Sequence, residues 1–256
     1  MSGAVSRPCV GVVMLNTSFP RFHGDIGNPS SFNSMDVDVR YKIVDAATVG
    51  RVVTASGIDE NVTDALLEAI HDFCKEGVDL ILTSCGFLSE LQVRFQRVSS
   101  VPVLASALEL LPLLRRCYGN NEIIAVMTYD SRRLNTHHLG MVSGSEITTT
   151  DNPAEHENLV IQGMENATDF YSMIAENKAE ANYESLAIEV SREAQKIKKN
   201  YHQCDGRVAA LVLECTNLSP FRQHIHRAAG VPVFDILDGA RFFVSGFRSE
   251  ANRYDG

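Results

Sequence analysis

Two segments of the chain repeat one pattern at a constant offset of 130 residues, without a gap. Residues 78–89 are an apolar run that reaches Cys85 and continues G-F-L-S; residues 208–219 are an apolar run that reaches Cys215 and continues T-N-L-S. A V-P-V triplet begins sixteen residues after each cysteine. Each copy therefore predicts a buried strand, a cysteine at its carboxyl end, a helix and a second short strand.

A weaker echo precedes each copy, because residues 10–18 and 123–131 are both apolar runs that end in polar side chains. Helices are predicted between the strands, at residues 61–76, 106–118 and 183–202. Strands that alternate with helices indicate an α/β fold with mainly parallel sheets. We expect two pseudo-symmetric, doubly wound lobes with a cleft between them. Residues 1–104 form the first lobe with Cys85, and residues 105–236 form the second with Cys215. The second half carries an insertion, within residues 152–182, whose role the sequence leaves open.

Composition excludes several classes of protein. The 256 residues carry a formal net charge of −9, so binding to nucleic acid is not expected. No apolar run reaches the roughly 18 residues of a membrane helix, and no apolar signal core opens the chain. The six cysteines include no C-x-x-C pair, which argues against a zinc ribbon and favours free thiols in the cytoplasm. No G-x-G-x-x-G follows a predicted strand, so a nicotinamide cofactor has no support.

The matched cysteines are the candidate catalytic residues. Ligands of open α/β sheets bind beyond the carboxyl ends of the strands, so facing lobes place Cys85 and Cys215 on opposite walls of one cleft. Free backbone N–H groups at these strand ends are expected to lower the pKa of both thiols. One thiolate could then remove a proton from a substrate carbon while the other thiol returns one.

A single cysteine at a strand end is usually a small buried hydrophobe, but two at matching places favour catalysis. Cys9, Cys74, Cys117 and Cys204 lack this context and are expected to serve packing or the surface. Short polar groups near the strand ends are candidate substrate-binding residues: Asn16, Thr17, Ser84, Thr128, Thr216 and Asn217.

These runs resemble the aspartate/glutamate/hydantoin racemase superfamily. The likeness rests on V-L-E-C-T-N-L at residues 212–218, L-T-S-C-G at 82–86, M-L-N-T at 14–17 and both V-P-V triplets, and it covers most of the chain. It implies a cofactor-independent racemase or epimerase that uses two thiols, with no metal, acting next to a carboxylate or carbonyl. It also implies that the last helix returns to the first lobe, which adds residues 237–256 to that lobe.

A loop rich in glycine and proline, residues 19–29, resembles the P-R-x-x-G-D-I-G-N-P loop of uncharacterised superfamily members. Its Arg21 could bind a substrate carboxylate in a bidentate fork, or it could simply pair with Asp25. Gly86 and Phe87 stand where amino-acid racemases carry Asn-Thr after the first cysteine. This departure predicts a larger or less polar substrate, such as a hydantoin ring.

Three alternatives stay open from the sequence: a maleate-isomerase-like enzyme, an arylmalonate-decarboxylase-like enzyme and a non-enzymatic binding module for small molecules. The expected partner is a small carboxylate or cyclic amide substrate. Nucleic acid and membranes are not expected as partners, and a homo-oligomer is left open.

Overall fold

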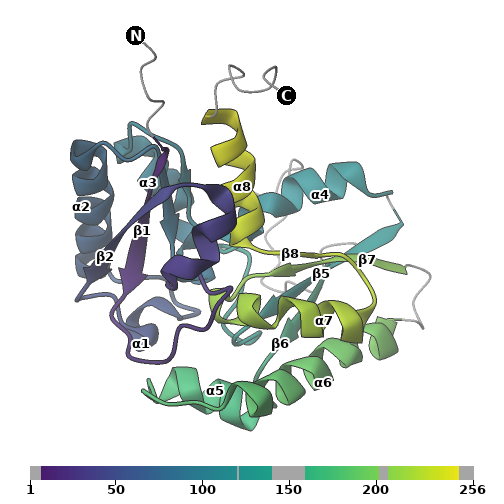
Figure 1. Cartoon of the computed structure of the whole chain (residues 1–256). Helices are drawn as coiled ribbons and strands as arrows, with labels where there is room; N and C mark the ends of the chain where they lie inside the picture. Colours follow the sequence, from purple (N-terminus) through teal and green to yellow (C-terminus); the bar gives the residue numbers. More distant parts are fainter. Residues whose placement is uncertain (1–6, 120, 140–158, 202–206, 248–256) are drawn as a thin grey trace.

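The computed structural model of the chain describes residues 7–119, 121–139, 159–201 and 207–247. It contains two four-stranded sheets, in the strand orders β2-β1-β3-β4 and β6-β5-β7-β8 (Figure 1). Every neighbouring pair of strands is parallel. The two orders are the same when the second sheet is numbered from β5, so the predicted α/β class and the two-lobe duplication are confirmed.

The first lobe is built around β1, whose apolar side chains are almost all buried because helices cover the sheet. Asp59 caps the amino end of its main helix, and Gly77 ends that helix in the left-handed conformation. The elements of this lobe are β1 (Cys9–Leu15), η1 (Pro29–Met35), β2 (Asp38–Val44), α1 (Val49–Val52), α2 (Glu60–Glu76), β3 (Leu80–Thr83), η2 (Gly86–Leu91), α3 (Gln92–Val98) and β4 (Val103–Leu104).

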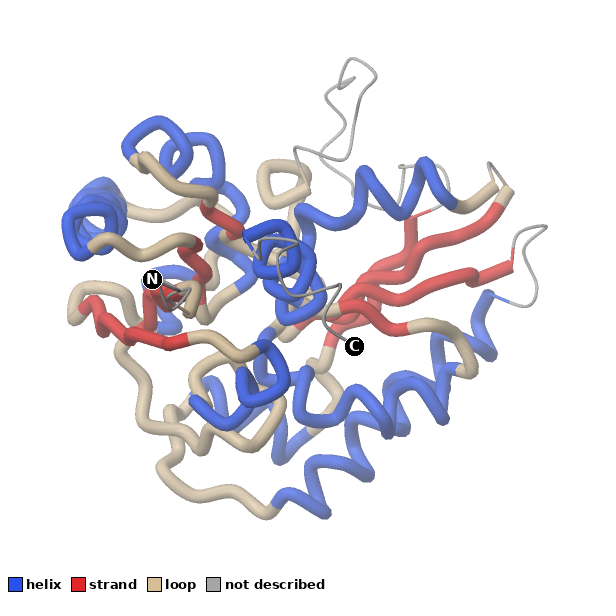
Figure 2. The backbone as a smooth tube through the Cα atoms, turned by 45° about the horizontal axis from the view of Figure 1, so that its top comes forward, coloured by secondary structure: helices blue, strands red, loops and turns tan. Residues whose placement is uncertain are grey.

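The second lobe repeats this order with longer helices. Its elements are η3 (Ala107–Leu110), α4 (Leu111–Cys117), β5 (Glu122–Thr128), β6 (Leu159–Gly163), α5 (Thr168–Ala175), α6 (Tyr183–Tyr201), β7 (Arg207–Leu213), η5 (Thr216–Phe221), α7 (Arg222–Ala229) and β8 (Val233–Phe234). In Figure 1, α4 lies on one side of this sheet, and α6 and α7 lie on the other. Figure 2 shows the same twisted layer of strands between helices.

The insertion expected at residues 152–182 includes structural parts of the second lobe. Its β6 is the edge strand of the second sheet and pairs with β5, while α5 packs against α6. Residues 152–158 lie outside the described part of the chain, as do Cys204 and residues 248–256. The insertion therefore supplies an edge strand and a helix of the second lobe.

The last helix, α8 (Ile236–Phe247), lies between the lobes in Figure 1 and contacts β3 and β4. Gly239 makes this approach close, because a Cβ there would overlap the Leu104 side chain. The exact lobe boundaries at 104/105 and 236/237 stay a prediction. Within the described residues, no helix combines the length and the hydropathy needed to cross a membrane.

Candidate active site

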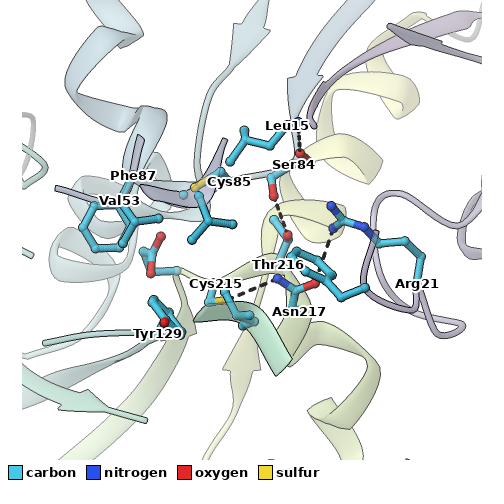
Figure 3. A pocket seen from close by; sticks show the side chains of 15 residues that line it. Leu15, Arg21, Val53, Ser84, Cys85, Phe87, Tyr129, Cys215, Thr216 and Asn217 are labelled. Atoms are coloured by element: carbon cyan, nitrogen blue, oxygen red, sulfur yellow. Dashed lines mark hydrogen bonds between the residues drawn. The ribbon is translucent and has the colours of Figure 1, made fainter. Parts of the chain in front are cut away.

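A small cavity lies between the lobes, where the carboxyl ends of β3 and β7 meet. Both cysteines of the repeat line it, and Figure 3 shows Cys85 and Cys215 reaching it from two sides. The volume open to the centre of a water molecule is about 20 Å³, roughly the space of a single water. The lining residues are Leu15, Phe19, Arg21, Val49, Val53, Ser84, Cys85, Gly86, Phe87, Tyr129, Ile174, Glu214, Cys215, Thr216 and Asn217.

Each cysteine stands at the turn between its strand and a short 3-10 helix, so the helix that directly follows the strand is tighter than an α-helix. Cys215 is 7% exposed and Cys85 is partly buried. The Asn217 amide donates to the sulfur of Cys215 at 3.8 Å. Thr216 Oγ1 donates to the Ser84 carbonyl oxygen at 2.8 Å, which joins the two turns across the lobes.

The expected lowering of the thiol pKa values is wrong. Burial, together with the neighbouring Glu214 carboxyl group, raises the pKa of Cys85 to about 12. Burial and Glu214 also raise the pKa of Cys215, and the nearby Cys85 thiol raises it as well. Backbone N–H groups of the following turns do lower both pKa values, as expected, but the loss of water around the sulfur outweighs them.

Arg21 enters the cavity from the loop after β1 and forms the predicted ion pair with Asp25, while its binding of a substrate carboxylate stays a prediction. Its Nη1 lies 3.2 Å from Asp25 Oδ1 and 3.3 Å from Asn217 Oδ1, and its Nη2 donates to Thr17 Oγ1 at 2.8 Å. The Asp25 side chain is 1% exposed, and its burial raises its pKa despite Arg21. In Figure 3, Arg21 lies on the side of the cavity opposite Phe87.

Glu214 is a buried acid in the wall of the same cavity. Its residue is 1% exposed, its Oε2 accepts a hydrogen bond from Thr128 Oγ1 at 2.6 Å, and the Tyr129 N–H also donates to the carboxyl group. Burial raises its pKa to about 7. Gly86 packs directly on this residue, since a Cβ at position 86 would overlap the Glu214 backbone oxygen and carboxyl group.

No family model matches the chain. The chain is 27% identical over 249 residues to the dimethylsulfoniopropionate lyase of Durusdinium sp. clade D, which covers 95% of the chain and 76% of that protein. It is 26% identical over 238 residues to dimethylsulfoniopropionate lyase 7 of Emiliania huxleyi (strain CCMP1516), which covers 93% of the chain and 67% of that protein.

Solved structures match over nearly the whole chain. Allantoin racemase from Klebsiella pneumoniae matches at a TM-score of 0.56 and 15% identity, covering 93% of the chain and 86% of the racemase. Glutamate racemase from Francisella tularensis matches at a TM-score of 0.53 and 14% identity, covering 96% of the chain and 85% of that racemase. A variant of arylmalonate decarboxylase matches at a TM-score of 0.54 and 14% identity, covering 95% of the chain and 94% of the decarboxylase.

The chain has the aspartate/glutamate/hydantoin racemase fold. This agrees with the resemblance carried by the sequence motifs. At these identities the solved structures establish the racemase fold alone, and the reaction is considered separately below.

The structure brings most of the predicted site residues of this racemase fold to one cavity. Eight of them line it: Arg21, Ser84, Cys85, Gly86, Phe87, Cys215, Thr216 and Asn217. Three predicted substrate-binding residues do not. Asn16 is exposed, and its backbone N–H donates to the Ala47 carbonyl oxygen. Thr17 lies behind Arg21, and Thr128 is fully buried behind Glu214.

Sequence reasoning missed Glu214 and Tyr129, together with apolar residues from distant segments such as Ile174 of α5. Glu214 carried a usable signal, since it is an acid at the end of an otherwise apolar, buried strand, where an unpaired charge is costly. Tyr129 directly follows β5 and stacks on Tyr171 at 4.6 Å between ring centroids. Among the described residues, no three histidine, cysteine, aspartate or glutamate side chains gather as metal ligands.

Proposed function

We propose that this protein is an enzyme that removes a proton from the carbon next to a carboxylate and eliminates a leaving group from the adjacent carbon. The proposed substrate is dimethylsulfoniopropionate, a propionate with a sulfonium group on its β-carbon. The observation that carries the proposal is the cavity that holds Cys85, Cys215, Arg21 and Glu214 together. The two relatives named as lyases of this compound support the same chemistry.

In the proposed reaction, a thiolate takes the proton from the α-carbon and becomes a thiol. The electron pair of the broken C–H bond forms the double bond between the α- and β-carbons. The β-carbon–sulfur bond breaks, and its electron pair leaves on sulfur. The products are acrylate and neutral dimethyl sulfide, so the step needs no oxidant or reductant.

Two features of the cavity suit this step. The N–H groups of Phe87 and Leu88 and the charge of Arg21 lower the pKa of Cys85, while the Asn217 backbone N–H and side chain do the same for Cys215. These groups oppose the effect of burial on the two thiol pKa values and so favour the thiolate form that the reaction needs. Arg21 and Asn217 are also donors suited to a substrate carboxylate, on which negative charge builds as the proton leaves.

The test is to incubate the purified protein with dimethylsulfoniopropionate and measure dimethyl sulfide in the headspace and acrylate by NMR. The proposal expects both products in equal amounts, and no products from a variant with both cavity thiols replaced by serine. Failure of the wild-type protein to form either product, with the double variant as a matched blank, would overturn the proposal.

Racemisation or epimerisation of an amino acid or hydantoin is the second candidate. The pair of thiols favours it, because Cys85 and Cys215 are close enough for one to raise the pKa of the other. Elimination requires one base, whereas two-thiol racemisation requires both. In D₂O, racemisation places deuterium on the α-carbon of recovered substrate, so NMR of a panel of amino acids, allantoin and hydantoins distinguishes the two reactions.

A further inference from the structure

Glu214 is an acid with no acidic counterpart in the other lobe. The repeat aligns it with Ser84, the residue before the first cysteine. Both residues continue their strands, since the Ser84 N–H donates to Val13 and the Glu214 N–H donates to Met127. Only the second lobe therefore presents a carboxyl group at this place in the cavity wall.

The Glu214 carboxyl group has hydrogen-bond donors but no cationic partner. Thr128 and the Tyr129 N–H donate to it, and no lysine or arginine of the described chain forms an ion pair with it. Arg21, the cation in the cavity lining, pairs with Asp25 instead. A carboxylate without a counter-charge is costly in a buried site, and a cationic ligand removes that cost.

The wall around Glu214 contains aromatic rings that suit the same kind of ligand. Tyr129 and Phe87 line the cavity and are 4% and 1% exposed. Ring faces attract cations whose charge is spread over methyl groups, such as sulfonium and quaternary ammonium ions, which cannot donate hydrogen bonds. The Gly86 backbone packs against Glu214 where a side chain would displace it. The acid is thus held in place by its neighbours.

We infer that Glu214 binds the onium group of a zwitterionic substrate, while Arg21 and Asn217 bind its carboxylate. The substrate class is a short carboxylate with a sulfonium or quaternary ammonium group on its β-carbon. This inference rests on the proposed function for the choice of ligand, but it concerns recognition and does not depend on turnover.

Binding of such a ligand is linked to a proton. Glu214 is partly protonated near neutral pH, because burial raises its pKa to about 7. A cation beside it lowers that pKa, so binding releases protons and tightens as pH rises from 6 to 8. The other charged or titratable residues in the lining are Arg21, Cys85, Tyr129 and Cys215, and burial raises the pKa of the last three.

The experiment compares two unreactive ligands by isothermal titration calorimetry. Trimethylammonium propionate carries the cation. Its tert-butyl analogue has the same shape and the same carboxylate but lacks the positive charge. We expect wild type to prefer the cationic ligand by at least about tenfold, and Glu214→Gln, which keeps an acceptor for Thr128, to bind the two nearly equally. Titrations in buffers of different ionisation enthalpy measure the released proton, which the variant should not release.

Equal affinity of wild type for both ligands, or binding of neither, overturns the inference. So does a preference or a proton release that persists in Glu214→Gln, since the thiols would then be its source. If the variant does not fold, the proton release measured with wild type tests the inference. Absence of proton release on binding between pH 6 and 8 then overturns it. Headspace dimethyl sulfide is scored separately. Recognition without product refutes only the elimination, and product without a role for Glu214 refutes only the inference.

Discussion

At the scale of single residues, the chemistry of the cavity follows from a conflict between burial and charge. Cys85, Cys215 and Glu214 all prefer their neutral forms there, because the surrounding protein excludes water. Hydrogen-bond donors from the two turns lower the thiol pKa values, but the effect of burial is larger. The site is therefore expected to become reactive only when a ligand changes the balance of charge.

Replacement of either cavity cysteine tests the proposed chemistry. If the protein catalyses elimination, one of the two cysteines acts as the base. Replacing that cysteine with serine should lower kcat at least ~100-fold, because the serine hydroxyl group is a far weaker base than a thiolate. Racemisation predicts losses of that size for both Cys85→Ser and Cys215→Ser. Cys117→Ser is the matched control, since Cys117 is exposed and outside the cavity. Wild-type rates in both cavity variants would contradict any role for the thiols.

The buried Glu214 carboxyl group also predicts how stability depends on pH. Its pKa rises from 4.5 to about 7 on folding, so between these values the native state holds more protons than the unfolded chain. Stability therefore falls as pH increases across this window, by on the order of 3 kcal/mol at full effect. Glu214→Gln lacks this titration.

Urea unfolding of wild type and Glu214→Gln at pH 5 and pH 8 measures the effect. The free energy of unfolding of wild type should decrease relative to that of the variant as pH increases. A difference between the two proteins that is constant over this range, or that changes in the opposite direction, contradicts the pKa assignment.

At the scale of elements, two 3-10 turns meet head to head and shape the cavity. Thr216, the first residue of η5, donates to the carbonyl oxygen of Ser84, which lies just before η2. Gly86, the first residue of η2, packs on the backbone of Glu214, which lies just before η5. Equivalent positions of the two repeats thus make reciprocal contacts. Thr216 makes its contact by a hydrogen bond, and Gly86 makes its contact because it has no side chain to hold the two backbones apart. The contacts explain why glycine suits position 86.

Gly86→Ala should disturb this contact. The added methyl group overlaps Glu214, so we expect the free energy of unfolding to fall by about 1–3 kcal/mol and activity to fall with it. Gly246→Ala is the matched control, because a Cβ there meets no atom within 4 Å and alanine suits the interior of α8. Thermal and urea unfolding check both, and equal stability of the two variants would argue against close packing at Gly86.

At the scale of the whole molecule, the lobes enclose the site. Arg133 Nη1 donates to the Val53 carbonyl oxygen at 2.8 Å, and Asn135 Nδ2 donates to that of Ala55 at 2.9 Å, so lobe two is fastened to the segment after α1. On the other side, Asn177 accepts from the Ser18 N–H at 2.6 Å. The space for about one water is smaller than a propionate, so we expect the cavity to widen when substrate enters.

Enclosure predicts slow alkylation of the cavity thiols. At pH 7, iodoacetamide should modify Cys117 at least ~100-fold faster than Cys85, because Cys85 combines restricted access with a small thiolate fraction. Below its pKa of about 12, the rate at Cys85 should rise about tenfold per pH unit. Peptide mass spectrometry over a time course measures both rates. Similar rates at the two cysteines, or no dependence on pH, would contradict an enclosed neutral thiol.

Much of this architecture could be predicted from the sequence, because buried strands require continuous runs of apolar residues. The apolar runs before Cys85 and Cys215 had to be strands, and the constant offset required the same topology twice. The segment from 159 to 175 was not readable in this way. Its strand and helix join the second lobe through pairing with β5 and packing on α6, which no local pattern encodes.

The sequence alone determined the duplicated α/β fold and the two strand-end cysteines, since both depend on hydrophobic periodicity and on spacing along the chain. Only the tertiary structure decided which polar groups share the cavity. It placed Glu214 in the cavity wall, moved Asn16 and Thr128 out of it, and reversed the expected pKa shift of the thiols. The physical reason is that desolvation depends on atoms brought in from both lobes, whereas the N–H groups that favour a thiolate belong to the local turn.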